Sequence, residues 1–201
     1  FSRAAEDEAA RFGPPVLDPR TGRLDLTDRP TFTMDPVDAR DFDDALSWRP
    51  LEGGGCEVGI HIADVAHYVS PGSALDDEAR ERATSVYLAG GVIPMLPHDL
   101  SSDLCSLVPD AGRLTMSVLA EMDARSGVSR YRITEGYIVS RARLSYEAGQ
   151  LILDGDPAAR ALVPPEVIRA LTELSAIGLR LRERRMKRGA LDLDVAETKA
   201  T

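Results

Sequence analysis

Residues 33–46 of this chain of 201 residues read TMDPVDARDFDDAL, and five aspartates fall within ten positions of this stretch. Carboxylates that are held this close in a folded site repel one another, and some stay protonated at neutral pH unless a cation neutralises them. Their hard oxygen atoms suit Mg²⁺ or Mn²⁺ better than zinc, which prefers nitrogen and sulfur. The stretch therefore favours a site for one or two metal ions. The aspartates are Asp35, Asp38, Asp41, Asp43 and Asp44.

Two other interpretations compete with a catalytic metal site. Aspartate is common in turns, so the stretch fits a solvated acidic turn as well. The interleaved Ala39, Phe42 and Leu46 speak against this, because they draw the segment toward the core. A calcium loop of the EF-hand type is disfavoured, since the spacing lacks its Asp-x-Asp-x-Asp-Gly pattern. A metal site is modestly favoured, and paired Mg²⁺ ions in such a site typically support phosphodiester hydrolysis.

Outward from this stretch, the sequence predicts a loop between strands. Residues 30–34 and 45–49 have strand character on either side of it, and residues 57–63 form a further strand. A helix is expected to start at Ser73 and to run to about Tyr87, with acidic residues in its first turn. Residues 90–107 are expected to be mostly irregular, because prolines interrupt them.

The rest of the chain predicts an α+β fold with a mixed, largely antiparallel sheet and helices packed around it. We expect residues 1–29 to form an N-terminal helix and linker, ahead of one larger unit over residues 30–201. The predicted elements of that unit are an antiparallel hairpin over residues 114–123 and 129–140, a short helix over 146–153, a long amphipathic helix from 165 to 189, and a strand over 191–195.

Composition narrows the function classes. The formal net charge of −9 argues against a whole-chain electrostatic grip on nucleic acid, so a polyanion would need a local basic patch. Residues 180–188 are one candidate, and cations that complement a helix C-terminus explain them equally well. No apolar run could span a bilayer and no signal peptide is visible, which predicts a cytoplasmic protein without membrane contact. The isolated Cys56 and Cys105 predict neither a disulfide framework nor a zinc site.

At the acidic stretch the chain closely resembles the RNB family of exoribonucleases, the ribonuclease II and ribonuclease R type. The resemblance continues through most of the chain in the order expected for that family. The matching blocks are VGIHIADVAHYV, GSALDDEARERATSVYLAGGVIPMLPHDLSSDLCSL, RARLSYEAGQLILDG and RMKRGALDLD. The resemblance implies processive, metal-dependent hydrolysis of single-stranded RNA from its 3′ end, with release of nucleoside 5′-monophosphates.

The resemblance also implies residue roles. It makes Asp35 and Asp44 the principal Mg²⁺ ligands, places Asp43 closest to the catalytic step, and gives Asp41 a supporting role in the metal and water network. Asp38 matches no catalytic position of the family. Two tyrosines resemble RNA-contacting tyrosines of the family, and stacking on an aromatic ring suits any base. They are Tyr87 and Tyr146, and we expect no catalytic role for His61, His67 or His98.

The chain is shorter than the catalytic domain of that family. Its later half, which supplies a glutamate and an arginine near the scissile phosphate, and its flanking cold-shock-like and S1-like domains are expected outside this sequence. We therefore expect the chain to be part of a longer protein, and to turn over poorly or not at all alone. A non-catalytic RNA-binding or assembly module of the same ancestry is the alternative. A phosphatase with Asp35 as nucleophile is disfavoured, because Val37 replaces the second aspartate of an Asp-x-Asp pair.

Overall fold

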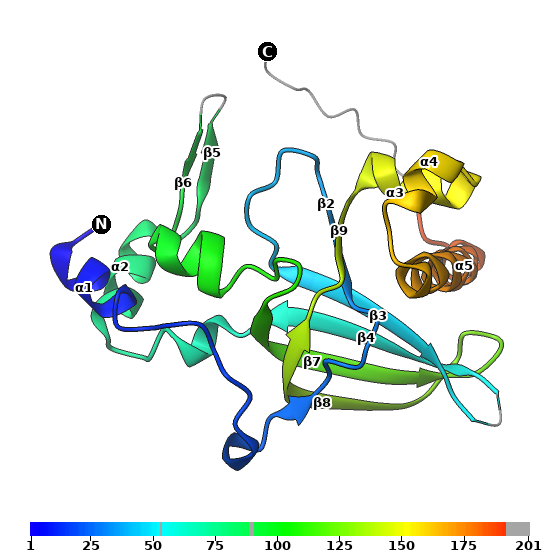
Figure 1. The fold of residues 1–201 in the computed structure, drawn as a ribbon, viewed down its shortest axis with the longest axis horizontal. Helices are drawn as coiled ribbons and strands as arrows, with labels where there is room; N and C mark the ends of the chain where they lie inside the picture. The colour runs from blue at the N-terminus through cyan, green and yellow to red at the C-terminus, as the bar shows by residue number, and fades with distance from the viewer. Residues whose placement is uncertain (53, 89–90, 192–201) are drawn as a thin grey trace.

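A computed structural model of the chain describes residues 1–52, 54–88 and 91–191 (Figure 1). Over these residues, the main sheet has seven strands in the order β1-β8-β7-β4-β3-β2-β9. Neighbouring strands are antiparallel from β2 to β8, whereas both edge strands pair in parallel, β1 with β8 and β9 with β2. The predicted mixed, largely antiparallel sheet is therefore confirmed. The strands are β1 (Leu24–Asp25), β2 (Phe32–Asp35), β3 (Asp44–Pro50), β4 (Cys56–Ala63), β7 (Gly112–Met122), β8 (Val128–Val139) and β9 (Ala142–Ser145).

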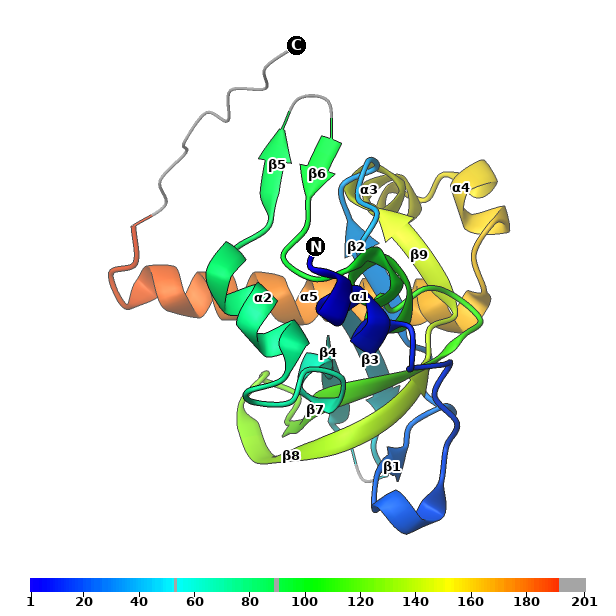
Figure 2. The same ribbon diagram turned by 90° about the vertical axis from the view of Figure 1, so that its left-hand side faces the viewer.

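Helices lie on both sides of this sheet (Figures 1 and 2). The chain after β9 forms three consecutive helices, and the last of them packs on β3. A short hairpin of two strands projects away from the sheet beside α2. The helices are α1 (Arg3–Ala9), α2 (Ala74–Arg82), α3 (Tyr146–Asp154), α4 (Pro157–Ala161) and α5 (Pro165–Lys187), with short helical turns η1 (Pro19–Thr21), η2 (Val65–His67) and the π-helical η3 (Asp99–Leu104); the hairpin strands are β5 (Val86–Leu88) and β6 (Gly91–Ile93).

Two apolar cores follow from the alternation of side chains along the strands. Ala45 of β3 belongs to the core that α1, α2 and η3 cover. Trp48, three residues further along β3, points to the opposite face and joins the core beneath α3 and α5. The sheet thus carries a helical layer on each face, and the ends of β2 and β3 lie between them.

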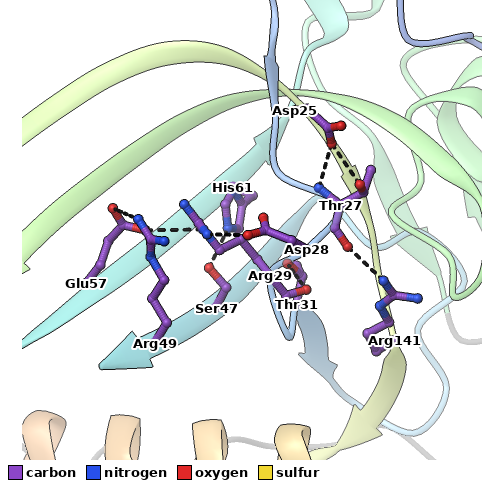
Figure 3. Close-up of polar contacts among 10 residues, drawn as sticks. All are labelled: Asp25, Thr27, Asp28, Arg29, Thr31, Ser47, Arg49, Glu57, His61 and Arg141. Carbon is purple, nitrogen blue, oxygen red and sulfur yellow. Dashed lines mark hydrogen bonds and ion pairs between the residues drawn. The ribbon is translucent and has the colours of Figure 1, made fainter. Parts of the chain in front are cut away.

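A buried polar layer covers part of the first face, where the segment before β2 crosses the sheet (Figure 3). His61 of β4 is fully buried and lies 2.9 Å from both the Ser47 and the Ser117 hydroxyl oxygen. Beside it, the Arg29 Nε atom lies 3.2 Å from a Glu57 carboxylate oxygen. His61 thus forms part of the hydrogen-bonded polar layer on this face of the sheet.

Several predicted elements are confirmed in type, and others are wrong. The β7–β8 hairpin, α3 and α5 agree with the predictions. The helix that starts after Ser73 ends at Arg82, because Ala83 adopts a left-handed conformation with φ of 63°. Tyr87 consequently lies on β5, and residues 90–107, predicted to be mostly irregular, contain β6 and η3. Strand β9 and helix α4 were not predicted from the sequence.

The strand predicted over 191–195 lies outside the described residues, except for Leu191. The division of the chain at residue 30 stays a prediction; β1 before it pairs with β8, and α1 packs against α2. None of the helices in the described ranges combines the length and the apolar character needed to cross a membrane.

Candidate metal centre between strands β2 and β3

The acid loop, residues 36–43, connects β2 to β3. Asp35 is the last residue of β2 and Asp44 is the first residue of β3, so these two carboxylates mark the two ends of the loop. Pro36 ends β2 because it has no backbone N–H for the sheet. The only paired residues between the two strands are Phe32 and Leu46, so the strands separate toward the loop. The two strands are therefore apart at the end where the acidic residues lie.

The acid loop forms one wall of a pocket of about 710 Å³. The four aspartates predicted as metal ligands, Asp35, Asp41, Asp43 and Asp44, all line this pocket. The β5–β6 hairpin and the segment around η3 form the other walls. The polar and aromatic residues around the pocket are Asp35, Asp38, Arg40, Asp41, Asp43, Asp44, Tyr87, His98, Ser101 and Ser102, with Leu88 and Val92 among the apolar ones.

Negative charge in this pocket is only partly compensated. Burial raises the pKa of Asp35, and the neighbouring charge of Asp44 raises it further. Burial also raises the pKa of Asp43, and the charges of Asp41 and Asp44 add to this effect. Both carboxyl groups therefore hold their protons more tightly than a solvent-exposed aspartate does, and a bound cation would relieve this repulsion.

The donor set fits a hard divalent cation. The Oδ2 atom of Asp35 is buried and has no hydrogen-bond partner in the protein, so its lone pairs are available to a cation. Within the described parts of the chain, no group of three or more His, Cys, Asp or Glu side chains has an arrangement that could hold a metal ion. Mg²⁺ usually takes only one or two protein carboxylates and completes its shell with water and substrate phosphate. An open arrangement of carboxylates is therefore suited to it.

The second half of the acid loop is anchored in the core through Phe42. The Phe42 side chain is buried, its backbone N–H donates to the Ser106 hydroxyl at 3.0 Å, and its carbonyl accepts from the Leu107 N–H at 2.8 Å. Ser106 is itself held by Arg113, whose Nε donates to the Ser106 carbonyl at 2.8 Å. Asp41 and Asp43, on either side of Phe42, are therefore attached to a rigid support.

The two predicted RNA-contacting tyrosines occupy different places. Tyr87 lines the pocket from β5, is 67% exposed, and donates from its hydroxyl to Asp41 Oδ2 at 3.3 Å. Burial and the charge of Asp41 raise the pKa of this tyrosine. Tyr146 does not line the pocket, but it begins α3 directly after Ser145, which pairs with Asp35. Both rings are exposed enough to stack on a base.

The prediction from the sequence left some of the pocket residues out of the site. Asp38 and His98 line the pocket, although no catalytic role was expected for either. The His98 Nδ1 atom lies 3.3 Å from the Ser102 hydroxyl oxygen. Irregular helical turns such as η3 are frequent at functional sites, but the prolines around it hide it in the sequence. The short elements after α2 bring His98 and Ser102 to the pocket that the acid loop also lines.

The basic run at residues 180–188 lies on the last turns of α5. Arg180 and Arg184 hold the turn between β7 and β8 through hydrogen bonds of 2.7 and 3.0 Å to the Ser126 side chain and carbonyl. A pocket of about 400 Å³ lies along the same turns and is lined by Arg182, Arg184, Arg185 and Arg188. Two arginines thus have a structural task, and the binding role of the others stays a prediction.

Comparison with known proteins places these features in a family. A sequence profile of the RNB domain matches residues 23–201. Ribonuclease R of Thermotoga maritima is 48% identical over 181 residues, which cover 89% of this chain and 25% of that protein. Ribonuclease R of Escherichia coli is 41% identical over 180 residues, which cover 90% of this chain and 22% of that protein. The chain therefore spans about a quarter of the length of these relatives.

Solved structures show the same fold. RNase R of Mycoplasma genitalium, in complex with ribose-methylated single-stranded RNA, superposes with a TM-score of 0.89 at 30% sequence identity. The match covers 99% of this chain and 31% of that chain. Yeast Ssd1, a pseudonuclease, matches with a TM-score of 0.72 at 24% identity over 88% of this chain and 21% of that one, which shows the shared fold alone.

Proposed function

Because this chain belongs to the RNB domain family, we propose that it supplies the acidic part of the active site of a processive 3′-to-5′ exoribonuclease. The substrate is single-stranded RNA, the products are nucleoside 5′-monophosphates, and the cofactor is Mg²⁺, with Mn²⁺ as a substitute. The observation that carries this proposal is the convergence of Asp35, Asp41, Asp43 and Asp44 on one pocket beside an exposed tyrosine. Relatives named ribonuclease R and an RNA-bound structural neighbour support it.

The residues of the pocket have separable tasks in this proposal. Asp35 and Asp44 hold the metal, which supplies charge neutralisation and an activated water when it is bound. Asp41 supports this site and is itself held by the Tyr87 hydroxyl. Burial among other acids makes the Asp43 carboxylate a stronger base than an exposed aspartate. A stronger base suits a group that takes a proton from the attacking water near the scissile phosphate.

RNA contacts complete the proposal. Tyr87 and Tyr146 offer exposed rings for stacking on bases at the 3′ end, which requires no particular sequence. The remaining catalytic residues of the domain and the flanking RNA-binding barrels lie outside this chain in the proposal. The acidic net charge agrees with this, because much of the basic RNA-binding surface is then elsewhere. A cytoplasmic location also stays a prediction.

Digestion of RNA by the longest form of the protein that contains this chain tests the proposal. A single-stranded RNA labelled at its 5′ end should shorten stepwise with Mg²⁺ and stop with a chelator. Asp43→Asn should lower the rate of mononucleotide release at least about a hundredfold while RNA binding persists, because a proton acceptor is lost.

Asp38→Asn is the matched control, because Asp38 lines the same pocket but has no assigned role. It should digest RNA at nearly the wild-type rate. Full activity of Asp43→Asn would refute the catalytic assignment. Tight RNA binding by the wild-type protein without release of mononucleotides in any divalent metal would instead favour the non-catalytic module.

A further inference from the structure

Arg143 of β9 reaches across the sheet edge to the first half of the acid loop. Because β9 pairs in parallel with β2, Arg143 lies opposite Thr33, two residues before Asp35. Its Nη2 atom donates to the Val37 carbonyl oxygen at 2.8 Å and lies 3.3 and 3.4 Å from the carbonyl oxygens of Pro36 and Ala39. One guanidinium thus gathers three backbone carbonyls that lie more than a hundred positions earlier in the chain.

The same guanidinium also contacts the second half of the loop. The Arg143 Cζ atom lies 4.9 Å from the centroid of the Phe42 ring, within the range of a cation–π interaction. Phe42 is fixed by its hydrogen bonds to Ser106 and Leu107. Arg143 therefore links the free part of the acid loop, residues 36–39, to the anchored part at Phe42. Asp41 lies in the segment between these two contacts.

The Arg143 guanidinium contacts the backbone of the acid loop and not its carboxylates. Among the described residues, no ion pair joins Arg143 to an aspartate of the pocket. The hydrogen bonds of Arg143 go to backbone carbonyl groups instead, which leaves the carboxylate oxygens available for a cation. Burial raises the pKa of Asp35, and the Arg143 charge opposes that rise. Arg143 thus lowers the repulsion around the loop without occupying its ligands.

We propose that Arg143 is a positioning residue: it holds the acid loop in the conformation that presents Asp41 and Asp43 to the pocket. Its consequence for RNA hydrolysis rests on the proposed function above, whereas its effect on the loop does not. The relevant comparison is with Arg141, two residues earlier. Arg141 is also exposed, and its Nη2 donates at 2.7 Å to the Thr27 carbonyl, which belongs to a different segment.

Amide hydrogen exchange in the metal-free, full-length protein tests the effect on the loop. The Ala39 and Phe42 amides report on it, because they donate to the Pro36 carbonyl and the Ser106 hydroxyl. In Arg143→Ala we expect both amides to exchange at least about tenfold faster, with the amides of β4 and β7 unchanged. Arg143→Lys, which keeps a cation that can donate to carbonyls, should restore part of the protection. Arg141→Ala should leave both amides at the wild-type rate.

Metal titration of RNA digestion tests the catalytic consequence. Arg143→Ala should raise the Mn²⁺ concentration for half-maximal activity several-fold, and Arg141→Ala should not. Unchanged exchange at Ala39 and Phe42 in Arg143→Ala would overturn the proposal, as would equally faster exchange over the whole sheet. Unchanged exchange together with weaker RNA binding would mean that Arg143 contacts RNA instead. If the full-length protein lacks nuclease activity but Arg143→Ala loosens the loop, the proposed function fails and the positioning role stands.

Discussion

His61 is a titratable residue that is fully buried in the fold. It is fully buried on β4 between the hydroxyls of Ser47 and Ser117. Burial lowers its pKa from 6.5 to about 4, and the nearby charge of Arg29 acts in the same direction. Because the folded state keeps the imidazole neutral, the unfolded chain binds more protons between these two pKa values. The free energy of unfolding therefore rises with pH across this window, by about 3 kcal/mol in total.

Replacement of this side chain should change the pH dependence of stability. In His61→Gln we expect the unfolding free energy at pH 7 to fall by about 1–2 kcal/mol, because the hydrogen bonds to the serines are disturbed. Between pH 4 and 6.5 the variant should lose less stability on acidification than the wild type. Urea unfolding at several pH values measures both effects. His98→Gln, at an exposed position, is the control, and an unchanged slope in His61→Gln would contradict the assignment.

At the level of residues, the sequence identifies the site residues that lie close together in the chain. It misses those that distant segments contribute. The four acids stand out because they lie within ten positions, and the structure collects them in one pocket. Arg143 and Ser106 contact the same loop from later strands and turns, and nothing near them in the sequence marks that contact. No catalytic role was expected for His98, yet the structure places it on the pocket wall, directly before η3.

Among the elements, the segment that leads into β2 depends on one buried carboxylate. Glu57 of β4 accepts two hydrogen bonds from Arg49, at 2.8 and 3.1 Å, and lies 3.2 Å from Arg29 (Figure 3). The Arg29 side chain is 10% exposed, whereas that of Arg49 is 41% exposed. Arg29 otherwise pairs only with the exposed Asp28 among the described residues. Glu57 therefore provides the buried countercharge that lets this segment cross the sheet.

Neutralising Glu57 should loosen this attachment. We expect Glu57→Gln to lower the unfolding free energy by about 2 kcal/mol, because a buried guanidinium loses its buried partner. Arg49→Gln removes the other, more exposed partner and should cost less than about 1 kcal/mol. Urea unfolding at pH 7 compares the two variants. Equal stability of Glu57→Gln and the wild type would show that this ion pair does not hold the segment.

The elements that the sequence predicts correctly are long and carry their own periodic pattern. The hairpin of β7 and β8 and the helix α5 are of this kind. Helix α2 was predicted too long, because its end depends on the left-handed conformation of Ala83 and not on a glycine or proline. Strand β9 was missed because it is short and exists through its pairing with β2. The local strand propensity of a short segment does not predict pairing with a strand that is distant in the sequence.

For the molecule as a whole, one half of a sheet face is left apolar and exposed. Helix α5 covers the half around Trp48 and Val58. Cross-strand pairs place the other half on the same face, since Ile60 pairs with Val118, which pairs with Ile133. The most exposed apolar residues of this half are Ile60, Ile62, Met116, Tyr131 and Ile133, between 40% and 67% exposed. Contiguous apolar surface of this kind promotes association.

We therefore expect the chain by itself to bind an apolar dye and to self-associate as its concentration rises. The double variant Ile60→Thr and Ile133→Thr should bind less dye and should stay monomeric up to a higher protein concentration than the wild type. Threonine keeps the strand propensity of isoleucine while it adds a polar group. Leu162→Ser, at an isolated position that is 86% exposed, is the control. Dye fluorescence and sedimentation velocity measure the outcome. Equal dye binding and equal self-association of the wild type and both variants would show that this face does not mediate association.

The parallel pairing of β9 with β2 sets the order in which the site can form. The contact between Arg143 and the Pro36 carbonyl joins residues 107 positions apart, so a long loop must close before it is made. During synthesis the aspartates leave the ribosome well before β9 does. Until β9 docks, the acid loop lacks one of its two attachments, and contacts of such long sequence separation form slowly. We therefore expect the candidate metal centre to be completed late in the maturation of the chain, after the β7–β8 hairpin that precedes β9 has formed.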